Sequence, residues 1–152
     1  METMSIGPWV VKYDAETTRA VYAQIESGDA ERCGCEPCLN FARVREKVYP
    51  QEALKVLDKL GVDFTKEAEV YHFSKVRPGW HHYGGSLHFV GKVEEVKPAD
   101  GGPTCFLKLD KNFSWSLSSK RELVPDAFGD LPVVQIIIDA RVPWVLHTDE
   151  PE

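Results

Sequence analysis

The sequence predicts an α+β domain in which three N-terminal helices pack on a largely antiparallel sheet of about five strands. Apolar residues recur at helical spacing until about residue 60, and they alternate at every second residue after Lys66. A short Asp110–Asn112 segment between two alternating stretches suits a tight turn between antiparallel strands. Helices that come first in the chain and strands that come later are typical of α+β domains.

The first half of the chain begins with a short predicted strand, Trp9–Tyr13, in which apolar residues alternate. Asp14 then suits a helix N-cap, Pro37 suits the first turn of a helix, and Gly61 suits a helix C-terminus. The three predicted helices span Ala15–Ile25, Pro37–Val48 and Pro50–Leu60.

The second half reads as strands that are separated by polar turns. The predicted strands span Val70–Val76, Leu87–Val96, Thr104–Leu109, Phe113–Leu117 and Val133–Asp139. Pro98–Pro103 is predicted to be a loop, and Val142–Leu146 could extend the last strand after a bend. Because the chain has 152 residues, of which 43% are hydrophobic, we expect one domain over 1–152, with loose ends at about 1–7 and 147–152.

Charge and hydropathy exclude several classes of partner. The formal net charge of −6 argues against a nucleic acid, because phosphate backbones are bound by clustered Lys and Arg. The strongly apolar run near Val133–Ile138 is too short to span a bilayer, and no basic and apolar leader is visible at the N-terminus. We therefore expect a cytoplasmic protein that binds neither nucleic acid nor membrane, and whose cysteines are metal ligands or catalytic thiols.

Three of the four cysteines, Cys33, Cys35 and Cys38, fall within the segment RCGCEPC. Cys35 and Cys38 form a C-x-x-C pair, whose spacing lets two sulfurs turn toward one ion. Cys33 can supply a third sulfur if Gly34 adopts a conformation that other residues disfavour. A helix N-terminus and a bound cation would both stabilise the thiolates, so the segment predicts a metal site, most simply for zinc.

A structural zinc site needs a fourth ligand. The candidates elsewhere in the chain are Cys105, His72, His81, His82 and His88. A histidine from the HHYGGSLH region is preferred, because Cys105 lies in the apolar stretch TCFLKL, where a free cysteine behaves as a small apolar residue. The predicted ligand set is Cys33, Cys35 and Cys38 together with His72 and His88.

Other interpretations of the cysteines stay open. The tetrapeptide Cys35-Glu36-Pro37-Cys38 resembles the active-site motif of thioredoxin-like oxidoreductases, although the preceding ESGDAER is polar and Cys33 does not fit. An iron–sulfur cluster could use all four cysteines, but the known spacings differ from this one. The cysteines could also be unmetallated thiols in an exposed loop.

The histidines lie in two alternating stretches between Val70 and Val93. If the paired residue numbers of this hairpin add to an even value, His72 and His88 share one face and could bind a metal; an odd value puts them on opposite faces. These histidines could also simply occupy the wetter face of a sheet. The intervening segment is a candidate ligand-binding loop, or a turn, made of Trp80, His81, His82, Tyr83, Gly84 and Gly85.

The segments CGCEPCLNFARVRE, YPQEALKVLDKLGVD, KEAEVYHF and HHYGGSLHFVG, taken in this order, resemble a group of small bacterial proteins with no assigned activity. The resemblance spans roughly Arg32–Gly91. It implies a bacterial, cytoplasmic origin and supplies no catalytic residues.

Three functional hypotheses follow from the sequence. The first is a structural zinc protein that binds a protein or a small ligand. The second is an enzyme, either a thiol–disulfide oxidoreductase that uses Cys35 and Cys38 or a metal enzyme with an open coordination position. The third is an interaction module without a cofactor.

Overall fold

The computed structural model describes residues 1–94, 96 and 105–152. In this part of the chain, seven strands form one antiparallel sheet in the order β1-β2-β4-β7-β6-β5, with β3 also paired to β4. The strands are β1 (Glu2–Ile6), β2 (Trp9–Tyr13), β3 (Glu69–Arg77), β4 (Trp80–Val93), β5 (Leu107–Asp110), β6 (Phe113–Ser118) and β7 (Val133–Pro143).

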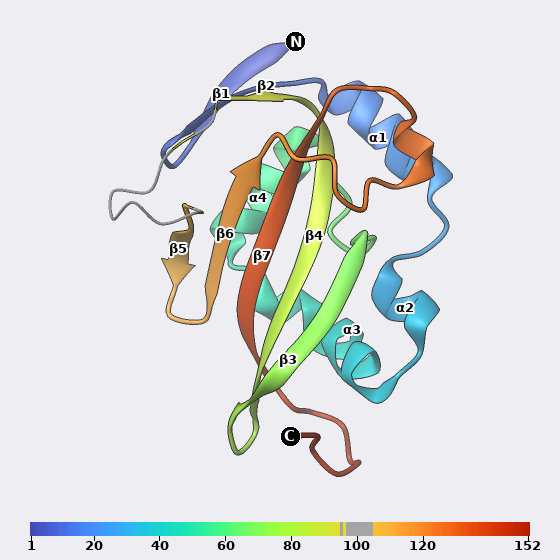
Figure 1. Cartoon of the computed structure of the whole chain (residues 1–152), viewed down its shortest axis with the longest axis vertical. Coiled ribbons are helices and arrows are strands. Elements are labelled where there is room, and N and C mark those ends of the chain that lie inside the picture. The colour runs from blue at the N-terminus through green and yellow to red at the C-terminus, as the bar shows by residue number, and fades with distance from the viewer. Residues whose placement is uncertain (95, 97–104) are drawn as a thin grey trace.

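Strand β4 organises the sheet because it is the longest strand, with 14 residues. It pairs with β7 from Trp80 to Val90 without a break in register. On its other edge, the first half of β4 pairs with β3 and its last three residues pair with β2. The two partners on this edge therefore follow one another along β4 (Figure 1).

Four α-helices and one short 3-10 helix accompany the sheet within the described residues. They are α1 (Ala15–Gln24), α2 (Asp29–Cys33), α3 (Glu36–Val48), α4 (Gln51–Leu60) and η1 (Asp126–Phe128). Helices α3 and α4 lie behind the sheet in Figure 1, and the segment that contains η1 crosses in front of the upper ends of β4 and β7. Asp14 caps α1 through the backbone N–H of Thr17 at 3.0 Å, as the sequence predicts.

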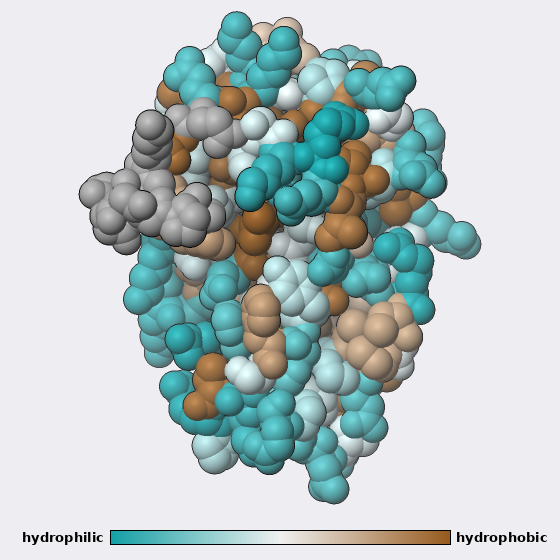
Figure 2. All heavy atoms as spheres, viewed as in Figure 1, coloured by the Kyte–Doolittle hydropathy of each residue, from teal (hydrophilic) through white to brown (hydrophobic). Residues whose placement is uncertain are grey.

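The main core lies between the sheet and helices α3 and α4. Tyr83 of β4 packs on Phe41 of α3, with ring centroids 5.5 Å apart, and Leu57 and Leu60 of α4 are also buried there. Figure 2 shows the opposite side of the sheet, where polar side chains cover most of the surface and apolar ones form separate patches. The helix-facing side therefore supplies most of the hydrophobic stabilisation.

The chain is α+β, but the predicted arrangement of three N-terminal helices on about five strands is wrong. The β1–β2 hairpin precedes every helix, α2 is an additional helix, and the described sheet has seven strands. Strand β1 was missed because it is a mostly exposed edge strand whose residues do not alternate clearly in hydropathy. Helix α2 was missed because its five residues provide too short a window for a helical period.

The predicted boundaries of the central hairpin also shift. Strand β4 begins at Trp80, so the segment expected to be a loop is a strand, and the turn lies at Pro78 and Gly79. Strand β7 continues without a break to Pro143. The predicted loop at Pro98–Pro103 lies outside the described residues, as do Glu95 and Thr104 of two predicted strands.

Candidate metal centre

The three clustered cysteines lie at the junction of α2 and α3. Cys33 is the last residue of α2, Cys35 is the N-cap of α3, and Cys38 is in the first turn of α3. Gly34 between the two helices has a φ of 71°, in the left-handed region that glycine adopts at little cost. No atom lies within 4 Å of a Cβ added there, so the glycine is required by backbone conformation and not by lack of space.

The sulfur atoms form a compact group. The Sγ atoms of Cys33 and Cys35 are 3.3 Å apart, and all three Sγ atoms lie within 4.8 Å of one another. Cys33 and Cys35 are exposed, whereas Cys38 is buried. This group could hold a metal ion at the protein surface, with Cys38 forming its inner side.

The thiols differ in their electrostatic surroundings. A hydrogen bond from the backbone N–H of Cys35, together with hydrogen bonds to the thiols of Cys35 and Cys38, lowers the pKa of Cys33. Burial, and then hydrogen bonding to the other two thiols, raises the pKa of Cys38. Cys33 therefore ionises more readily than Cys38, and a cation at the cluster would favour ionisation of Cys38 as well.

Asn40 and Tyr83 fix the first turn of α3 against the sheet. The hydroxyl of Tyr83 donates to the carbonyl of Pro37 at 2.7 Å. The side chain of Asn40, which is fully buried, donates to the carbonyl of Pro143 at 3.1 Å and accepts from the backbone N–H of Val145 at 2.8 Å. Sequence reasoning missed Asn40, although an amide next to the apolar Phe41 of a predicted helix was a usable signal.

A buried ion-pair network fixes α2 against α3. Arg45 of α3 pairs with Glu31 of α2 through two hydrogen bonds of 2.8 Å, and its other side contacts Glu67 at 3.0 and 2.9 Å. Tyr49 donates to the same Glu67 carboxylate at 3.1 Å. Glu67 is fully buried, and burial raises its pKa to about 7. The network sets the relative position of the two helices whose junction carries the thiols.

His72 and His88 are not brought together. Tyr83 of β4 pairs with His72 of β3, so the paired residue numbers add to an odd value at this point of the hairpin. The regular register of β4 then places His88 on the face opposite to His72. His88 is fully buried, its Nε2 donates to the carbonyl of Glu122 at 3.1 Å, and burial lowers its pKa to about 4.

The histidines at the start of β4 have partners of their own. The Nδ1 of His81 lies 2.8 Å from the Nε2 of His72, and its Nε2 lies 2.9 Å from a carboxylate oxygen of Glu150. The Nε2 of His82 lies 2.8 Å from Oδ2 of Asp139, on the other face of the strand. Burial, and then coulombic repulsion between imidazolium forms of His72 and of its neighbours His81 and His82, lower the pKa of His72, while the hydrogen bond with His81 lowers that of Glu150.

No fourth protein ligand joins the three thiols among the described residues. The candidate histidines have the partners given above, and Cys105 packs, partly buried, against the hydrophobic core. Of the predicted set of Cys33, Cys35, Cys38, His72 and His88, only the three cysteines come together in the described residues.

The predicted ligand-binding loop is part of β4. His81, Tyr83, Gly84 and Gly85 are buried, while Trp80 and His82 are partly buried. A Cβ on Gly84 would meet the Tyr71 ring at 2.7 Å, so this glycine allows an aromatic side chain to pack against the strand. The space beside Gly84 is therefore filled by the Tyr71 side chain, and the backbone there is not open to a ligand.

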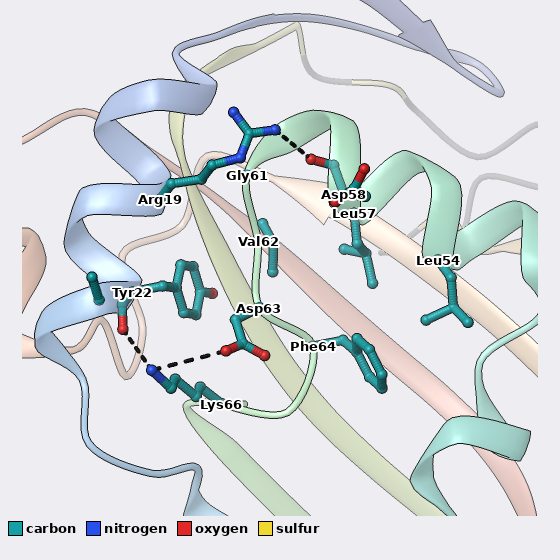
Figure 3. A pocket seen from close by; sticks show the side chains of 11 residues that line it. Arg19, Tyr22, Leu54, Leu57, Asp58, Gly61, Val62, Asp63, Phe64 and Lys66 are labelled. Carbon is teal, nitrogen blue, oxygen red and sulfur yellow. Dashed lines mark hydrogen bonds and ion pairs between the residues drawn. The ribbon is translucent and has the colours of Figure 1, made fainter.

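A hollow of about 480 Å³ lies between α1 and α4, away from the thiols (Figure 3). Its walls include Tyr22, Leu57 and Phe64, and its volume is in the range of small-molecule sites. The two cations beside it are already engaged: Arg19 donates to the carbonyl of Asp58 and Lys66 to that of Tyr22, both at 2.9 Å. The hollow therefore adds no chemistry to the thiol cluster.

Comparison with known proteins gives no relative: no protein family, curated protein or solved structure matches this chain. None of the helices in the described residues has the length and apolar character needed to cross a membrane. The fold and the site thus define an α+β protein with a surface cluster of three thiols that could hold a metal ion. The similarity to small bacterial proteins that the sequence suggests stays a prediction.

Proposed function

We propose that this protein binds Zn²⁺ through Cys33, Cys35 and Cys38, with the fourth coordination position open to water or to an exchangeable ligand. The observation that carries the proposal is the mutual distance of the three sulfurs, all within 4.8 Å. Thiolates near a helix N-terminus are soft anionic ligands, which zinc accepts at tetrahedral positions.

The ligand set favours a single bound ion over an iron–sulfur cluster. Protein thiolates favour Zn²⁺, Cu(I) and iron–sulfur clusters. An iron–sulfur cluster of the common type takes four cysteines, and Cys105 packs against the core instead of joining the other three. Zinc with three protein ligands and one exchangeable ligand fits the sulfurs that are present.

An open position distinguishes this site from the closed zinc clamp expected from the sequence. The three sulfurs come from residues 33–38 alone, so an ion here would tie the α2–α3 junction and not clamp it to the sheet. Because Cys33 and Cys35 are exposed, a donor atom from a small molecule or a protein could reach the ion. Such an open site belongs to exchange or catalysis more often than to pure structure.

We also propose a cytoplasmic location and a small-molecule or protein partner. Thiolates that bind an ion must stay reduced, and a reducing compartment maintains them, so the proposed zinc site supports a cytoplasmic location. The net charge of −6 supports a small-molecule or protein partner over a nucleic acid or an anionic membrane surface.

Cobalt substitution tests this proposal. The intensity of the thiolate-to-Co²⁺ charge-transfer band reports how many thiolates bind the ion. Wild-type protein should give the intensity of three thiolates, and Cys33→Ser, Cys35→Ser or Cys38→Ser should each remove about one third of it. Cys105→Ser is the matched control and should leave the band unchanged. A spectrum without thiolate bands would rule out the site.

A second candidate function is thiol–disulfide exchange. It is favoured by the exposed Cys33, whose pKa is lowered and whose Sγ lies 3.3 Å from that of Cys35. In this reaction two thiols lose two electrons and two protons to a disulfide substrate, which is reduced to two thiols. Mass spectrometry after equilibration in glutathione buffers tests it, because an oxidoreductase should form an intramolecular disulfide at a defined potential.

A further inference from the structure

Two imidazole rings meet nitrogen to nitrogen on the β3–β4 hairpin. The Nε2 of His72 lies 2.8 Å from the Nδ1 of His81, and the ring centroids are 5.0 Å apart. The register of the hairpin shifts just after His72, and the two rings belong to residues that are not direct cross-strand partners. Strand pairing alone therefore does not bring the two rings together, and their contact depends on how the two side chains are oriented.

Glu150 of the C-terminal segment determines which ring nitrogens carry protons. Its Oε1 accepts the backbone N–H of Gly79 at 2.7 Å and lies 2.9 Å from the Nε2 of His81. A carboxylate only accepts, so the Nε2 of His81 carries the proton and its Nδ1 presents a lone pair to His72. His72 then donates from its Nε2, and the pair is held by a single N–H···N hydrogen bond.

The geometry points to a second divalent-ion site in which His72 Nε2 and His81 Nδ1 are the ligands and Glu150 orients His81. A metal-bound histidine typically donates its other ring N–H to a carboxylate, which is the arrangement of His81 and Glu150. His81 already has the required tautomer. His72 would acquire it by moving its proton from Nε2 to Nδ1, so no net proton is released.

The ligand atoms indicate the class of ion. The observed 2.8 Å is the length of the hydrogen bond between the two nitrogens, whereas a tetrahedral ion at a metal–nitrogen distance of about 2.1 Å needs them about 3.4 Å apart. His72, which is only partly buried, would therefore move when an ion binds. Imidazole nitrogens suit Ni²⁺ and Cu²⁺, whereas thiolates favour softer ions, so the site would prefer a different ion from the thiol cluster.

Burial and charge around the pair support a cation. His81 is fully buried and thus held in place, whereas His72 is only partly buried, which leaves room for water to complete the coordination. Glu150 and Glu152 bring two negative charges, and Lys75, which lies 3.5 Å from Glu152, brings one positive charge. The net charge of these three side chains is negative, which favours a bound cation, and none of them belongs to the thiol cluster.

Nickel titration of a Cys33→Ser/Cys35→Ser variant tests this site independently of the thiols. Both replaced thiols are exposed, so the variant should fold. Calorimetry should show about one Ni²⁺ per chain, with amide NMR signals broadened around His72, His81 and Glu150. His72→Gln should lower the affinity by at least about tenfold, while His82→Gln, on the opposite face, should leave it unchanged.

The tail carboxylates provide a second matched pair. Glu150→Gln should weaken Ni²⁺ binding by about 10- to 100-fold, as expected for the loss of an orienting partner, and Glu152→Gln should have little effect. Absence of Ni²⁺ binding, or binding that His72→Gln does not weaken, would show that the two rings share only a proton. Neither result would bear on zinc binding by the thiols, because the titrated variant lacks two of them.

Discussion

The three thiols and the histidines of β3 and β4 are assembled in opposite ways. The thiols come from six consecutive residues, and two of the three are exposed. The histidine pair joins two strands to the C-terminal segment, and His88 is fully buried on the other face of β4. A site made by one short segment depends on local backbone geometry, whereas one made across a sheet depends on strand register.

The largest expected effect is on stability, and it tests the ion pairs that hold α2 and α3 together, not the thiols. Arg45→Ala would leave the buried carboxylate of Glu67 without its cation, and should lower the free energy of unfolding by about 3–5 kcal/mol. Urea unfolding in the presence of a chelator measures this. Arg43→Ala, at an exposed position of the same helix, should change stability by less than about 0.5 kcal/mol. Equal effects of the two variants would show that the network does not hold α2 and α3 together.

The next effect tests the buried histidine of β4. Burial lowers the pKa of His88 from 6.5 to about 4, so below pH 6.5 the unfolded chain binds a proton that the folded chain excludes. The associated stability is present above pH 6.5 and is lost as the pH falls toward 4, with about 2 kcal/mol lost between pH 7 and pH 5. His88→Gln should remove this part of the pH dependence, as measured by urea unfolding at both pH values. The exposed His147→Gln should retain it.

A smaller effect concerns the backbone that positions the thiols. Gly34→Ala should destabilise the chelated protein by about 1 kcal/mol, because an L residue is disfavoured at a φ of 71° although space is available. Gly34→Asn should cost less, since asparagine tolerates the left-handed region better than alanine does. Thermal unfolding of both variants measures the difference. Equal melting temperatures for alanine and glycine would show that the junction does not require this conformation.

The smallest expected change in stability is that of Cys33→Ser, and it tests directly whether this thiol binds the ion. With chelator present, Cys33→Ser should melt at the wild-type temperature, because its side chain is exposed. With excess Zn²⁺, only the wild-type protein should gain stability, since an ion that binds the folded state alone stabilises it. A variant that gains as much stability as the wild type would remove Cys33 from the metal site.

The sequence predicted the parts of the molecule that depend on neighbouring residues. The caps at Asp14 and Gly61, and the role of Gly34, follow from local conformational preferences, and all three appear in the structure. The proximity of Cys33, Cys35 and Cys38 also follows from their spacing in the chain.

What the sequence could not supply depends on pairing between distant segments. The register of β3 on β4 decides that His72 faces away from His88, and a shift of one residue would reverse this. The contact of Glu150 with His81 requires the path of the C-terminal segment, which no periodicity reveals. The strand that alternation predicts from Leu87 begins instead at Trp80, and the glycines of the expected loop or turn lie inside it, where Gly84 packs under the ring of Tyr71.

Elemental analysis of protein purified without a metal-affinity tag, combined with a thiol count under denaturing conditions, tests the central claim most directly. The proposed three-thiolate site predicts about one zinc per chain and four free thiols once the zinc is removed. Metal-free protein in which two thiols are missing would contradict zinc binding, and would identify the cluster as a dithiol that forms a disulfide.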